Sequence, residues 1–84
     1  LEKEMLAHFA AEETLLFPDY AAVAPYEVVE LRAAHGRIRE LIQQLVDAAV
    51  QSSVTKAQVL ELVNALLAHH GAEETGVYRW ARAR

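Results

Sequence analysis

The chain has 84 residues, of which 54% are hydrophobic and 24% are charged, and its formal charge is −4 at pH 7. This composition is typical of one small globular domain, here residues 1–84, and excludes a disordered or low-complexity chain. The acidic balance without a Lys/Arg cluster argues against nucleic-acid binding, and the absence of cysteine excludes disulfides and thiolate metal sites.

Apolar residues recur at spacings of three and four along almost the whole chain, which predicts helices and leaves no convincing strand. We expect a first helix over Leu1–Phe17. It should end at Pro18, because the residue before a proline is pushed out of the helical region. A short connection over Asp19–Ala24 should follow.

Two further helices are expected after this connection. The second should begin at Pro25, a favoured first-turn residue, and run to about Val50. The third should begin after Thr55, which forms a capping box with Gln58, and run to about Thr75. Short connections make neighbouring helices antiparallel, so the sequence predicts an all-α, up-down helical bundle.

Ionisable residues interrupt the apolar stripe of each expected helix. The stripe of the first helix continues to Leu15, and that of the second contains Val28, Leu31, Ile38 and Ile42. The interrupting residues are His8, Glu12, His35, His69 and Glu73. Burying an ionised group without a partner costs several kcal/mol, so these side chains should lie together.

The helical rise of about 1.5 Å per residue places the three histidines at one level of the bundle. His8 lies about nine residues before the end of its helix, and His35 lies about nine residues after the start of the next. His69 follows Thr55 by about fourteen residues, and His35 precedes the end of its helix by about fifteen. Imidazoles and carboxylates converging without a thiolate make a site for a transition metal such as iron, manganese or zinc.

A repeated motif supports this hypothesis. The segment LAHFAAEETLLF (Leu6–Phe17) returns as LAHHGAEETGVY (Leu67–Tyr78), with seven of twelve positions identical. In each copy a His and a Glu at i and i+4 project from one helical face, so one turn offers two ligands to one centre. Two such turns suit a pair of metal ions.

The segment HFAAEETLLFP (His8–Pro18) resembles the signature of the hemerythrin-like HHE cation-binding domain, and AHHGAEETGVY (Ala68–Tyr78) resembles its companion on the last helix. His35 in LRAAHGRIREL matches the intervening histidine of the family. The resemblance implies a four-helix bundle around a non-haem iron pair, commonly oxo- or hydroxo-bridged, that binds oxygen or responds to it. The implied terminal ligands are His8, His35 and His69, and the implied bridging carboxylates are Glu12 and Glu73.

The chain departs from the family's oxygen carriers in two ways. The family's first helix, which supplies a further His, has no counterpart before Leu1, and a second His of the carriers' third helix is replaced by Leu31. The missing side of the metal site would be completed by water, by a residue outside this sequence or by another copy of the chain. We therefore expect a homo-oligomer or a completing helix.

The remaining polar and aromatic residues allow several roles. Glu13, His70 and Glu74 are each interpreted as flank residues or as partners of the ligands. Tyr78 and Trp80 are interpreted as end-packing residues rather than redox relays.

The leading hypothesis is a di-iron module that binds or senses oxygen or a related small molecule, such as nitric oxide or peroxide. One alternative is an oxidase or peroxide-reducing enzyme, for which the sequence offers no clear general acid or base beyond the ligands. The other is a structural interaction domain. No secretion signal or membrane-span pattern is present, so we expect a cytoplasmic location without a membrane partner.

Overall fold

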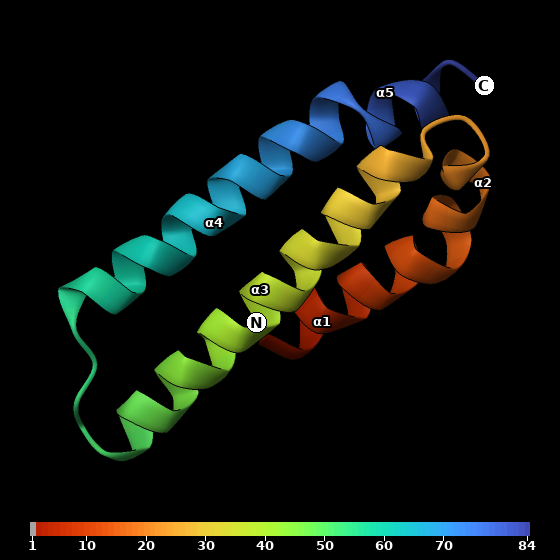
Figure 1. Ribbon diagram of the computed structural model, residues 1–84. Helices are drawn as coiled ribbons and strands as arrows, with labels where there is room; N and C mark the ends of the chain where they lie inside the picture. Colours follow the sequence, from red (N-terminus) through yellow and green to blue (C-terminus); the bar gives the residue numbers. More distant parts are fainter. Residues whose placement is uncertain (1) are drawn as a thin grey trace.

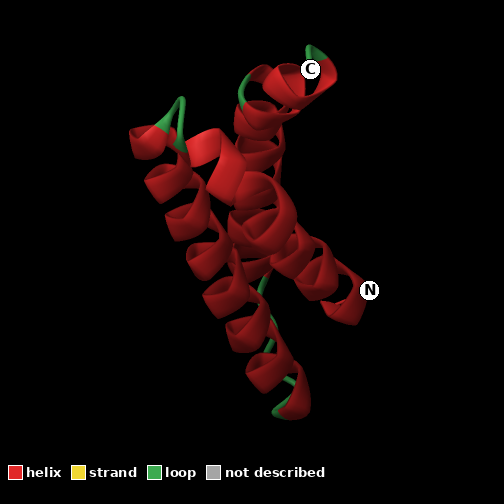
Figure 2. Ribbon diagram, turned by 90° about the vertical axis from the view of Figure 1, so that its right-hand side faces the viewer, coloured by secondary structure: helices red, strands yellow, loops and turns green. Residues whose placement is uncertain are grey.

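The computed structural model describes residues 2–84, so the expected helix start at Leu1 lies outside the described residues. Three helical segments run antiparallel (Figure 1), and over the described residues all regular structure is helical (Figure 2). This confirms the predicted all-α bundle. The elements are α1 (Glu2–Ala11), the π-helix η1 (Glu12–Leu16), α2 (Phe17–Ala21), α3 (Pro25–Val50), α4 (Lys56–Thr75) and α5 (Val77–Arg82). Within residues 2–84, no helix is long and apolar enough to cross a membrane.

The first segment is longer than the sequence predicted. The expected stop at Pro18 is wrong, because Phe17 keeps helical dihedrals (φ −62°, ψ −39°) and the helix continues to Ala21. Pro18 stands in the first turn of α2, where its missing N–H is tolerated. Burial of Phe17 and Tyr20 in the core stabilises this extra turn and limits the connection to residues 22–24.

The π-helix η1 also changes which residues of this segment face the core. The Phe17 N–H donates to the Glu12 carbonyl five residues earlier, so the turn is wider than in an α-helix. Leu15, expected in the core, is therefore 71% exposed, whereas Phe17 is fully buried. The predicted stripe of the first helix is wrong at this point.

Helices α3 and α4 agree with the predicted bounds. α3 begins at Pro25 and ends at Val50, and its predicted stripe residues Val28, Leu31, Ile38 and Ile42 are buried. The capping box of α4 is confirmed. The Gln58 N–H donates to Thr55 Oγ1 at 3.2 Å, while the Thr55 N–H donates to Gln58 Oε1 at 2.9 Å.

The third segment bends at Gly76, which separates α4 from α5. A Cβ atom at this position would collide with the Glu27 carboxylate and would lie 3.0 Å from the Ala72 carbonyl oxygen. A larger residue at this bend would therefore have to displace the flexible Glu27 side chain of α3.

Two apolar clusters lie along α3, which packs against both α1 and α4. One contains Phe17, Tyr20, Val28, Leu31 and Val77, and the other contains Phe9, Ile38 and Ile42. Because His35 lies between Leu31 and Ile38 on α3, the polar residues of the interior have apolar packing on both sides.

We predict that Thr55→Ala lowers the free energy of unfolding by about 1 kcal/mol, because one N-terminal N–H of α4 loses its acceptor. Urea denaturation followed by circular dichroism measures the change. Thr55→Ser keeps the hydroxyl and should remain close to the unsubstituted chain. Equal losses in both variants would contradict a capping role.

Candidate metal centre

Four ionisable side chains meet in the interior between the two apolar clusters. Glu12 comes from η1, His35 comes from α3, and His69 and Glu73 come from α4. One potential ligand atom from each lies within 4.8 Å of the others. All four side chains are at most 5% exposed. Three separate helical segments thus bring two imidazoles and two carboxylates to one point.

Several polar atoms of this cluster lie close together without forming hydrogen bonds. His35 Nε2 is 3.1 Å from Glu12 Oε1, and His69 Nε2 is 3.1 Å from Glu73 Oε2. These pairs lack the required geometry. The buried atoms without a hydrogen-bond partner among the described residues are Glu12 Oε1, His35 Nε2, both ring nitrogens of His69, and Glu73 Oε2. Buried polar groups normally have a partner, so the cluster has the arrangement of atoms directed at a shared centre.

Glu13 sets the orientation of His35. The Nδ1–H of His35 donates to Glu13 Oε2 at 2.7 Å, and Arg39 Nη2 donates to the same oxygen at 2.8 Å. With Nδ1 protonated, the Nε2 atom of a neutral His35 presents its lone pair to the cluster. A carboxylate on the outer nitrogen of a histidine is the usual support for a metal-binding imidazole.

The charges of the cluster demand a cation. Burial lowers the pKa of His35, but the adjacent carboxylates of Glu12, Glu73 and Glu13 outweigh this effect and raise it to about 9. Burial likewise raises the pKa of Glu73, yet the neighbouring His35 and His69 hold it well below its usual range. The Glu73 carboxylate therefore stays ionised and favours a positive charge beside it, which a proton or a metal ion can supply.

His8 lies at the edge of this cluster instead of within it. Its side chain is 58% exposed, and its Nε2 atom is 3.3 Å from Glu12 Oε2. The sequence predicted that His8 would lie together with the other four residues, but the inward position on α1 belongs to Phe9, which is 3% exposed. A role for His8 as a ligand stays a prediction.

Tyr78 closes the cluster on the side of His8. Its hydroxyl donates to Glu12 Oε2 and lies 3.0 Å from His8 Nε2. Burial, together with the acceptor Glu12, raises the pKa of Tyr78 above its usual range, so the phenol stays protonated. Tyr78 packs against the apolar cluster of Phe17, as expected of an end-packing residue, but the sequence did not predict the contacts of its hydroxyl with Glu12 and His8.

Two phenylalanines cover other sides of the cluster. The Phe9 ring stacks on His35 with 3.9 Å between ring centroids and meets His69 edge to face at 5.6 Å. The Phe17 ring stacks on His35 at 5.3 Å. These rings lower the local polarity, which strengthens every electrostatic interaction in the cluster.

The polar residues next to the expected ligands in the sequence differ in whether they contact the cluster. Glu13 supports His35, whereas His70 is exposed and Glu74 lies 3.4 Å from Arg82 Nη2 at the surface. The sequence did contain a signal for Tyr78. It occupies the position of Phe17 in the repeat, so a hydroxyl replaces a hydrogen at a place that faces the core.

Comparison with known proteins agrees with this geometry. No curated protein and no solved structure matches the chain significantly. A family model described as "Hemerythrin HHE cation binding domain" matches residues 1–81. The matched region contains both copies of the His/Glu motif and His35, and thus every residue of the buried cluster. The chain belongs to the hemerythrin HHE cation-binding domain family.

Proposed function

We propose that the buried cluster holds a pair of iron ions and that this centre binds or senses oxygen or a related small molecule. The description of the family names cation binding. The residues proposed to hold the metal are His8, Glu12, His35, His69 and Glu73. Iron, when bound, would supply reversible redox change and an affinity for small ligands.

The unpaired buried atoms carry this proposal. A carboxylate or imidazole without a partner in the interior is strongly unfavourable, and a metal ion would satisfy all of these atoms together. Nitrogen and oxygen donors without sulfur fit iron, and they also fit manganese and zinc. Metal analysis distinguishes these ions.

The position of Glu12 supports two ions instead of one. Its Oε1 atom lies beside His35, whereas its Oε2 atom lies beside His8. One carboxylate therefore has an imidazole near each of its oxygens. This is the arrangement in which a carboxylate can serve two centres.

An oxidase or peroxide-reducing enzyme is the second candidate, and Tyr78 is the observation that favours it. The Tyr78 hydroxyl beside Glu12 is a hydrogen-bond donor that a molecule bound in the cluster could use. Consumption of oxygen or peroxide above that of free iron would favour this function.

Self-association stays a prediction. α4 carries exposed apolar side chains over two turns and more, as expected if another helix covers this face. They are Val59, Leu60, Val63 and Leu67. Light scattering that shows a folded monomer at micromolar concentration would contradict it.

We predict that His69→Ala and Glu73→Gln abolish most metal binding after loading with ferrous iron, because each removes a buried ligand. At free metal near 100 times the dissociation constant, binding adds about 2.7 kcal/mol to the free energy of unfolding, and the variants should lose this increment. Elemental analysis and thermal unfolding with and without a chelator measure both effects.

His70→Ala is the matched control, since His70 is the exposed neighbour of His69 on the same helix. It should retain the metal content and the stability increment of the unsubstituted chain. The structural alternative would be favoured if the unsubstituted chain took up no metal and if His69→Ala did not change the stability.

We predict that Glu13→Gln weakens metal binding by about 10- to 100-fold, because His35 loses the charged acceptor on Nδ1. Competition with a chromophoric chelator measures the affinity. Glu74→Gln changes the equivalent residue of the second repeat, which has no contact with His35, and should leave the affinity unchanged. Equal affinities of the two variants would show that Glu13 does not support the site.

A further inference from the structure

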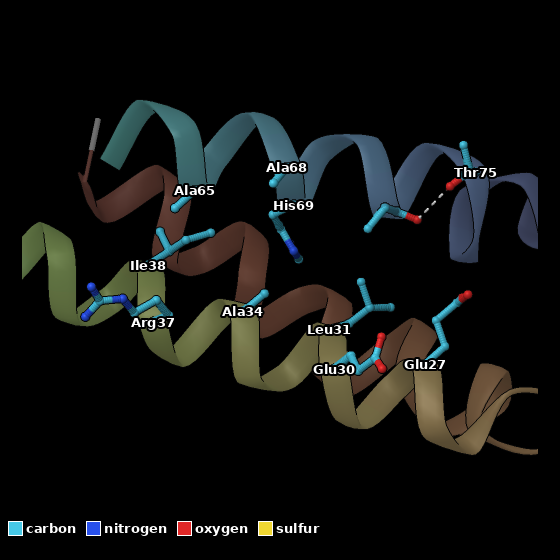
Figure 3. Close-up of a pocket in the computed structure, with 11 residues that line it drawn as sticks. Glu27, Glu30, Leu31, Ala34, Arg37, Ile38, Ala65, Ala68, His69 and Thr75 are labelled. Atoms are coloured by element: carbon cyan, nitrogen blue, oxygen red, sulfur yellow. Dashed lines mark hydrogen bonds between the residues drawn. The ribbon is translucent and has the colours of Figure 1, made fainter. Parts of the chain in front are cut away.

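A groove of about 400 Å³ separates α3 from α4 on the side of the bundle shown in Figure 3. Short side chains line its middle, with Ala34 on α3 and Ala65 and Ala68 on α4. Leu31 and Ile38 form its apolar floor. The groove exists because alanine methyls face each other where longer side chains would fill the space.

His69 connects this groove to the buried cluster. Its side chain points from α4 into the space between the two helices (Figure 3) and lines the groove. It is also one of the four residues whose ligand atoms converge. Neither ring nitrogen of His69 has a hydrogen-bond partner among the described residues.

Aromatic rings cover other sides of the cluster. Phe9 and Phe17 stack on His35, and the Tyr78 hydroxyl bonds to Glu12 next to His8. A molecule approaching from these sides must displace an aromatic side chain. On the groove side it meets alanines and then His69.

From this difference we infer that the groove between α3 and α4 receives a small uncharged molecule and leads it past His69 to the cluster. The inference rests on the proposed function, since it supplies the route for the ligand of that site. Ala34 and Ala68 set the width of the route.

The lining indicates the chemical class of the molecule. Methyl groups of alanine, leucine and isoleucine offer no hydrogen bonds, so they favour an apolar diatomic gas over a polar metabolite. The carboxylates of Glu27 and Glu30 lie at one end of the groove (Figure 3) and repel anions. At the other end Arg37 is paired with Glu61 and Glu40, which reduces its attraction for anions.

Xenon tests whether the groove admits such a molecule, because xenon enters apolar cavities and needs no bound iron. Methyl NMR spectra of the zinc-loaded or metal-free chain are recorded at increasing xenon pressure. We expect the largest shifts at the methyls of Leu31 and Ile38. Ala34→Leu and Ala68→Leu should reduce these shifts by roughly threefold or more, since the added methyls occupy the same space.

Ala33→Leu is the matched control, because Ala33 is exposed on α3 and lies outside the groove. It should give the same shifts as the unsubstituted chain. Circular dichroism checks that all three variants fold. The inference would be overturned if the methyls of Leu31 and Ile38 did not shift, for instance because a second copy of the chain covers the groove. Equal shifts in all variants would overturn it as well.

Stopped-flow mixing of the reduced, iron-loaded chain with nitric oxide tests the route itself. Ala68→Leu should slow the reaction by roughly tenfold through a higher barrier to entry, whereas Ala33→Leu should not change it. Equal rates would overturn the route and leave the proposed function standing. A chain that binds no iron but shows the xenon shifts would refute the proposed function, while the groove would still be shown to admit an apolar molecule.

Discussion

The interior of this bundle depends on the attraction between two buried carboxylates and a positive charge. Glu12 and Glu73 lie where water cannot stabilise their ions, and both approach His35. Either His35 binds a proton or a cation takes its place. Loss of that charge would leave ionised oxygens in an apolar interior, which typically destabilises a protein by 3–5 kcal/mol in total. Folding and cation binding are therefore coupled through the same side chains.

The π-helix η1 is the local structure that makes this arrangement possible. It begins at Glu12 and includes Glu13, so the wide turn lies at the residues that contact the two nitrogens of His35. Glu12 approaches Nε2 from inside the cluster, and Glu13 holds Nδ1 from its outer edge. π-turns within helices are frequent at functional sites, where they redirect side chains that an α-helix would separate. The turn also buries Phe17 against His35.

Much of this arrangement could be predicted from the sequence, because its signals are local and periodic. The stripe of α3, the capping box at Thr55 and the His/Glu repeat each follow from spacing alone. Of the five side chains that the sequence predicted to converge, four do so. The π-turn could not be predicted, because such turns are rare and the helical periodicity of a sequence carries no signal for them. That single change exposed Leu15, and burial of Phe17 and Tyr20 carried the helix past Pro18. The roles of Glu13 and Tyr78 depend on contacts between distant segments, which periodicity does not describe.

The two copies of the repeat are not equivalent, and they give the cluster different surroundings on its two sides. In the first copy His8 is exposed and Phe17 is an apolar cover, whereas in the second copy His69 is buried and Tyr78 carries a hydroxyl. The hydroxyl of the second copy reaches back to the His/Glu pair of the first. The cluster therefore has a polar edge at His8 and Tyr78, whereas short apolar side chains line the middle of the groove at His69. If the centre binds an apolar ligand as proposed, proton exchange and ligand entry would use these two different sides, although a nearly repeated sequence forms both.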